Sequence, residues 1–162
     1  MEEPSGSNEG DHVDRVLLGP GGRFILVKAT GADTGGAYCL LEFKAEAKTP
    51  WVNPHIHLHC DEGIVVVEGE LSVRIGPQQL SAAAGSYVLI PRGTPHSHSN
   101  PAGATTRYLA IFSPAGMEEY FAELDSLIRS SASGLPDVNK VRELNAKYGQ
   151  QRLDASSFFA NG

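Results

Sequence analysis

The sequence has little cysteine and no long apolar run, and each shortage removes a class of proteins. Two cysteines, Cys39 and Cys60, stand in 162 residues, which does not resemble the disulfide framework of a small secreted domain. The longest apolar stretches, residues 64–67 and 87–90, are far too short to cross a bilayer. We therefore expect no membrane partner.

Positive charge is also scarce. Lys and Arg number 13 against 19 Asp and Glu, which gives a net charge of −6, and the basic residues are scattered singly. Because phosphate binding needs a basic surface, we expect no nucleic acid partner. The first twelve residues are acidic and rich in Gly and Ser, without the basic and apolar regions of a secretory signal. A cytoplasmic location is the expectation.

What the sequence does contain is a series of short β-type runs separated by glycine and proline. They lie at 24–27, 37–43, 55–60, 64–67, 71–75, 79–82, 87–90 and 107–112. Many short strands at close spacing, with Gly/Pro turns between them, predict an all-β sandwich or barrel.

The hydrophobic period changes to that of a helix after Pro114. The apolar residues at helical spacing are Met117, Tyr120, Phe121, Leu124, Leu127 and Ile128. They form one stripe, which predicts a helix that packs on the core. Ser113 is the expected N-cap and Pro114 the first helical residue. A second helix is predicted over 137–148, with Gly149 as its stop.

These patterns divide the chain into three parts. Residues 1–12 are polar with almost nothing to bury and predict a disordered tail. Residues 13–113 form the β-barrel, and 114–162 form a helical extension. Its two helices are too short to be stable alone, so we expect them to pack on the outside of the barrel.

Histidine is concentrated in two places. Five of the six histidines lie within 55–59 and 96–98. Since strand residues two apart share a face, His55 and His57 present two imidazoles side by side. A third histidine from another strand and one carboxylate would complete a mixed nitrogen and oxygen metal site, with positions left for water, oxygen or substrate.

Around these histidines the sequence resembles the two conserved motifs of the cupin superfamily. The first consists of His55, one residue, His57, four residues, Glu62, six residues and Gly69. The second consists of Gly85, five residues, Pro91, one residue, Gly93, two residues, His96, three residues and Asn100. The segments 112–121 and 146–149 are further similar to the C-terminal helices of single-domain, quercetin-dioxygenase-like bacterial cupins.

This resemblance implies a fold and a set of site residues. The fold is the cupin jelly-roll barrel, and the ligands of one divalent metal ion are His55, His57, Glu62 and His96. In cupins the metal is iron or manganese, and nickel, copper, zinc or cobalt in some members. The glycines of both motifs are implied to be turn residues, and Asn100 to stabilise a turn. The resemblance also implies a homodimer.

The leading functional hypothesis is an oxygen-using, dioxygenase-like oxidoreductase that acts on a small organic substrate, aromatic or enolic. Glu62 would serve both as a metal ligand and as the catalytic base that takes the substrate proton. One alternative is a non-redox cupin enzyme, namely an isomerase, cyclase, decarboxylase or lyase, that uses the metal as a Lewis acid. Another is a cupin that only binds a small molecule. Four ligands do not decide among these hypotheses.

The sequence does not decide the roles of several residues near the predicted ligands. His59 and His98 have the strand parity of the ligand histidines, so each either faces the cavity or lies at its rim. Cys60 is expected to be a buried small apolar residue rather than a nucleophile. Four aromatic residues either line the cavity or belong to the core: Tyr38, Trp51, Tyr87 and Phe112.

Overall fold

The computed structural model describes residues 15–19 and 24–160, so the tail predicted over 1–12 lies outside the described residues. The strands are β1 (Arg15–Leu18), β2 (Phe24–Ala29), β3 (Cys39–Ala45), β4 (His55–His57), β5 (Asp61–Glu68), β6 (Glu70–Ile75), β7 (Gln78–Ala83), β8 (Tyr87–Ile90), β9 (His96–Ser99), β10 (Thr106–Ser113) and β11 (Gln150–Arg152). The helices are α1 (Met117–Ser130), α2 (Val138–Lys147) and α3 (Ala155–Ala160).

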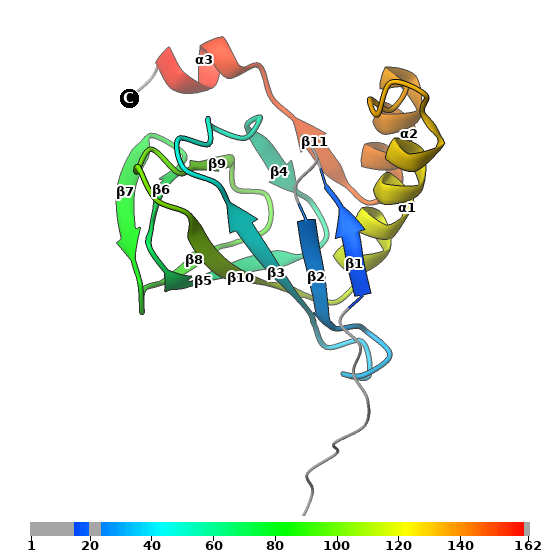
Figure 1. Ribbon diagram of the computed structural model, residues 1–162, viewed down its shortest axis with the longest axis horizontal. Coiled ribbons are helices and arrows are strands. Elements are labelled where there is room, and N and C mark those ends of the chain that lie inside the picture. The colour runs from blue at the N-terminus through cyan, green and yellow to red at the C-terminus, as the bar shows by residue number, and fades with distance from the viewer. Residues whose placement is uncertain (1–14, 20–23, 161–162) are drawn as a thin grey trace, which may run out of the picture.

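The strands form two antiparallel sheets that face each other (Figure 1). The six-stranded sheet has the order β1-β2-β3-β10-β5-β8, and the five-stranded sheet has the order β11-β4-β9-β6-β7. Chain neighbours such as β4 and β5 lie in different sheets, as in a jelly roll. This confirms the predicted all-β barrel.

Alternating burial along the strands builds the core between the two sheets. On β10, Tyr108, Ala110 and Phe112 are buried while Arg107 is exposed, because successive side chains point to opposite faces. The apolar residues buried between the sheets include Ile64, Val66, Leu71, Val73, Val88 and Ile90. This apolar cluster does not include the histidines of β4 and β9, which lie elsewhere between the two sheets.

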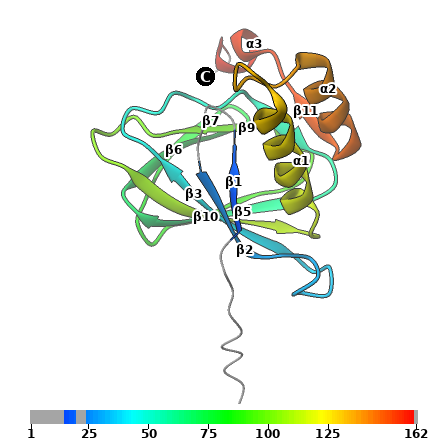
Figure 2. The same cartoon turned by 45° about the vertical axis from the view of Figure 1, so that its right-hand side comes forward.

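Helices α1 and α2 lie side by side, with α1 next to β1 and α2 next to β11, as Figures 1 and 2 show. The predicted stripe on α1 is confirmed as core, since Met117, Tyr120, Leu124 and Ile128 are buried. They pack in one cluster with residues of β1 to β3 and of α2. Among the described residues, no helix is both long and apolar enough to cross a membrane.

The predicted start of α1 is wrong by three residues. Ser113 still belongs to β10, where it pairs with Asp61, and its hydroxyl donates to the carbonyl of Ala37. It therefore does not cap the helix. Helix α1 begins at Met117 after Gly116, whose amide donates to the carboxylate of Glu118. The second helix agrees with the prediction, because Asp137 accepts hydrogen bonds from the amides of its first turn.

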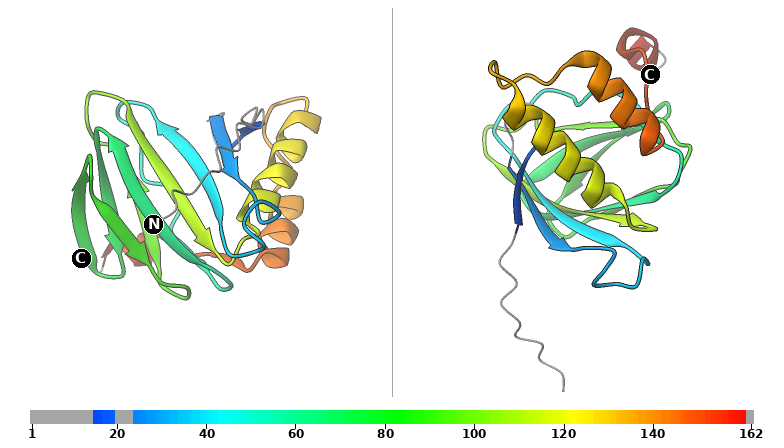
Figure 3. Two further views of the ribbon diagram at one scale, coloured as in Figure 1. Left: turned by 90° about the horizontal axis from the view of Figure 1, so that it is seen from below. Right: turned by 90° about the vertical axis from the view of Figure 1, so that its right-hand side faces the viewer.

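The strand predicted over 55–60 is shorter than expected. It ends at His57 because the chain then turns to cross from the five-stranded sheet to β5 in the other sheet. Four elements are additional to the predicted runs, namely β1, β9, β11 and α3. Figure 3 shows α3 apart from the pair formed by α1 and α2. Strand β11 joins the barrel's own sheet next to β4, so the C-terminal segment also contributes to the wall of the barrel.

Candidate metal centre

The two sheets bring the four predicted ligands to one point. His55 and His57 lie on β4, His96 lies directly opposite His55 on β9, and Glu62 reaches them from β5 in the other sheet. One ligand atom from each of the four residues lies within 4.8 Å of all the others. Three are almost fully enclosed, with 5% of His57, 4% of Glu62 and 1% of His96 exposed.

Backbone carbonyls orient two of the imidazoles. Nδ1 of His55 donates to the carbonyl of Asn53 at 2.8 Å, and Nδ1 of His96 donates to the carbonyl of Thr94 at 2.9 Å. A carbonyl oxygen can only accept, so Nδ1 carries a hydrogen in both rings, and Nε2 is the nitrogen left to bind a metal ion. Such a partner on the far nitrogen is what fixes a histidine ligand in metal sites.

The carboxylate of Glu62 is held by two histidines. Its Oε2 lies 3.1 Å from Nε2 of His96 and 3.2 Å from Nε2 of His57. Burial raises the pKa of Glu62, but the hydrogen bonds and charges of these two histidines outweigh burial and hold it well below its usual range. Burial lowers the pKa of His96, but the hydrogen bond and the charge of Glu62 outweigh burial and raise this pKa above its ordinary value. Because burying an unpaired carboxylate is costly, a positive charge beside Glu62 stabilises its ionised form.

His55 contrasts with His96. Burial, followed by the neighbouring imidazoles of His96 and His57, lowers the pKa of His55 well below its ordinary value. It is therefore neutral at physiological pH, which is the form that binds a metal. Three imidazole nitrogens and one carboxylate oxygen suit a divalent transition metal, so the residues present fit the predicted ion.

A cavity of about 290 Å³ opens beside His55, His57 and Glu62. Its aromatic lining consists of Phe43, Trp51, Tyr108, Phe112, Tyr120 and Phe121, and its polar lining includes Asn53, His98, Gln150 and Arg152. This volume is at the small end of ligand cavities, and flat apolar walls with a few polar groups are typical of sites for small organic molecules.

The structure places each residue that the sequence left open. His98 lines the cavity, and its Nε2 lies 2.9 Å from the hydroxyl of Tyr108. His59 is exposed and lies against Gly149, outside the cavity lining. Trp51 and Phe112 line the cavity, whereas Tyr38 and Tyr87 are exposed elsewhere.

Both thiols are buried and free, and this makes a prediction about reactivity. Burial raises the pKa of Cys60 to about 12, and burial together with Glu118 raises that of Cys39 to about 12. The thiolate is the reactive form, so at pH 8 only roughly one thiol in 10⁴ is ionised. We expect Ellman's reagent to label neither cysteine in the folded protein, while both react once the chain is unfolded in guanidinium. Rapid labelling of one thiol in the folded protein would contradict the burial of Cys60 and Cys39.

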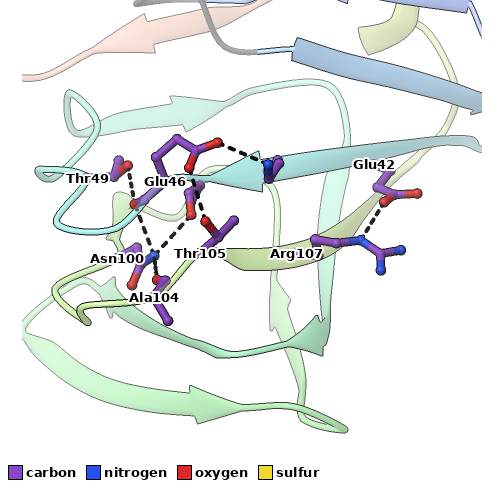
Figure 4. Close-up of polar contacts among 9 residues, drawn as sticks. Glu42, Glu46, Thr49, Asn100, Ala104, Thr105 and Arg107 are labelled. Atoms are coloured by element: carbon purple, nitrogen blue, oxygen red, sulfur yellow. Dashed lines mark hydrogen bonds and ion pairs between the residues drawn. The ribbon is translucent and has the colours of Figure 1, made fainter.

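Asn100 and Gly69 fix the turns that hold the ligand strands, and Figure 4 shows the contacts of Asn100. The Asn100 side chain is fully buried and donates to the carbonyls of Ala45, Glu46 and Ala104 at 2.8–3.0 Å. It confirms the predicted turn role and ties the end of β9 to the end of β3. Gly69 has φ of +80°, and a Cβ there would lie 2.6 Å from the hydroxyl of Thr106. The motif glycines Gly85 and Gly93 also have positive φ.

Comparison with known proteins gives the same family by sequence. Residues 40–112 match the family described as the Cupin domain, a segment that contains all four predicted ligands. Quercetin 2,3-dioxygenase of Bacillus subtilis (strain 168) is 32% identical over 92 residues, which are 57% of this chain and 26% of that protein. The chain therefore spans about a quarter of the length of that relative.

Solved structures agree with the fold. KdgF from Halomonas sp. has a TM-score of 0.56 at 17% identity, covering 65% of this chain and 92% of that one. The polyketide cyclase RemF from Streptomyces resistomycificus has a TM-score of 0.54 at 19% identity, covering 70% of this chain and 80% of that one. At these identities the likeness shows the double-sheet barrel alone.

Proposed function

We propose that this chain, in which residues 40–112 match the Cupin domain family, is a metal-dependent enzyme that uses dioxygen to oxidise a small aromatic or enolic molecule. The observation that carries the proposal is the convergence of three imidazoles and one buried carboxylate beside a cavity with aromatic walls. The dioxygenase relative supports the redox form of the chemistry over the Lewis-acid form.

The chain's own residues suit this role. His55, His57, Glu62 and His96 would hold one ion of iron, manganese, nickel, copper, zinc or cobalt. When bound, such an ion supplies Lewis acidity and, if redox-active, electron exchange with dioxygen. The aromatic walls exclude water and orient a flat substrate. Glu62 is a buried carboxylate that lines the cavity, and we assign to it the proton of a substrate hydroxyl or carbon.

The test is an oxygen-electrode screen of protein loaded with each metal in turn, against phenolic and 1,3-dicarbonyl compounds. We expect oxygen consumption that needs both a redox-active metal and the substrate. It should fall by at least about 100-fold in Glu62→Gln, a substitution that keeps the shape but removes the base and the charge. A matched control is Glu68→Gln, since Glu68 is exposed at the far end of the same strand.

Two results would reject the proposal. Turnover by zinc-loaded protein without oxygen consumption would favour a cyclase, isomerase, decarboxylase or lyase. Tight binding of a compound without turnover would favour a binding protein. The homodimer and the cytoplasmic location remain predictions from the sequence.

A further inference from the structure

We propose that Arg152 forms an anion-binding subsite in the cavity, which selects a small, flat organic acid as the ligand. The proposal deepens the proposed function because it names the substrate class of the same site. That the bound acid reacts rests on the proposed function. That the acid binds is argued independently, from the position of β11 in the sheet.

The strand register places Arg152 beside the candidate metal ligands. Strand β11 pairs with β4 so that Arg152 lies opposite His55 and Gln150 lies opposite His57. Residues directly opposite each other in an antiparallel pair project to the same face, with Cβ atoms about 4.5–5.5 Å apart. Both β11 residues accordingly line the cavity together with the two histidines.

The positive charge of Arg152 is not balanced within the cavity. Arg92, Arg107 and Arg129 each pair with a carboxylate, but Arg152 has no such ion pair among the described residues. The carboxylate that lines the cavity is Glu62, and its hydrogen bonds go to His57 and His96 instead. Arg152 is exposed while it lines the cavity, so its guanidinium is accessible to an anionic group of the ligand.

Tyr120 lies in the same cavity lining as Arg152. Its hydroxyl donates to Oδ1 of Asn145 at 3.0 Å, so the lone pairs of the phenolic oxygen remain to accept. Burial raises the pKa of the Tyr120 hydroxyl, and the nearby positive charge of Arg152 opposes that rise. An arginine has five N–H donors in a planar fork, which can bind a carboxylate through two parallel hydrogen bonds.

The other residues that line the cavity limit the size and shape of the acid that can bind. Trp51, Phe112 and Phe121 provide flat apolar surfaces, and about 290 Å³ admits a molecule of about one substituted ring. The ligand class is therefore an aromatic or similarly planar acid, with its anionic group toward Arg152 and its other substituents toward the histidines.

Trp51 gives a direct assay, because it is the single tryptophan of the chain and it lines the cavity. Its fluorescence is titrated with benzoate and with neutral benzamide, in metal-free and in cobalt-loaded full-length protein. We expect benzoate to bind more tightly than benzamide in both forms. Arg152→Gln should weaken benzoate binding about tenfold and leave benzamide unchanged, because a charge-assisted hydrogen bond contributes more than a neutral one.

Three further measurements decide the outcome. Arg129→Gln removes the same charge from an exposed site on α1, outside the cavity lining, and should change neither affinity. Arg152→Lys should restore part of the benzoate affinity. Added salt should weaken benzoate binding to the wild type more than to Arg152→Gln. Equal loss of both ligands, no loss, or the same loss in Arg129→Gln would overturn the proposal. The benzoate preference of the metal-free protein tests Arg152 even if no metal binds.

Discussion

Replacing His57 with alanine is expected to abolish most of the bound metal. His57 is buried and supplies one of the four converging ligand atoms, so its loss removes a bond that no other described residue is placed to replace. The loss of affinity should exceed the roughly 10–100-fold that removal of an outer partner of a ligand costs. Elemental analysis of the purified variant, with the metal content expressed per chain, measures the effect.

His59→Ala is the matched control for this substitution. It removes the same imidazole two residues further along, but His59 is exposed and outside the cavity lining. We expect it to retain the metal content of the wild type. Because His57 also packs edge-on against Phe112 at 5.5 Å, a melting curve must show that the variant is folded. His96→Ala provides a second route, and full stoichiometry surviving both substitutions would contradict the ligand assignment.

Asn100→Ala is expected to destabilise the fold by about 3 kcal/mol, because a buried group that loses its partner costs about 1–3 kcal/mol. The substitution leaves three carbonyls without the Asn100 amide and the amide of Ala102 without its acceptor. A chain of this size should lose roughly 10 °C of melting temperature. Thermal unfolding followed by circular dichroism measures it.

Asn139→Ala is the control, since Asn139 is exposed on α2 and its side chain meets only Arg142 at 3.4 Å among the described residues. Its effect should stay within about 0.5 kcal/mol. If Asn100→Ala melts like Asn139→Ala, the turn does not depend on the Asn100 side chain. The candidate site would then owe its shape to the sheets alone.

The candidate ligands were predictable because their signal is local. Residues two apart on a strand share a face, so the positions of His55 and His57 predict a pair of neighbouring imidazoles from the sequence alone. The spacing of Glu62 and His96 adds the other two through the cupin motifs, and the structure brings all four within 4.8 Å. The apolar stripe of α1 was likewise readable, because helical periodicity lies within one segment.

The cavity wall was not predictable in the same way. Strand β11 has three polar residues, and its partner β4 lies more than 90 positions earlier, so neither periodicity nor composition indicates the pairing. Arg152 and Gln150 are therefore not among the predicted site residues, although they lie opposite His55 and His57. The prediction of Ser113 as a helix N-cap was wrong for a related reason. A serine before proline is typical of a helix start, whereas the pairing of Ser113 with Asp61 in the sheet is a long-range contact.

The proposed function depends on one divalent transition metal held by these four residues. It is tested by the metal content of the full-length wild-type protein, purified without added metal or chelator and then dialysed against cobalt. We expect one ion per chain and a visible cobalt spectrum that is absent from His57→Ala. Wild-type protein that is folded yet takes up no cobalt, or takes up as much after His57→Ala and His96→Ala, would contradict it.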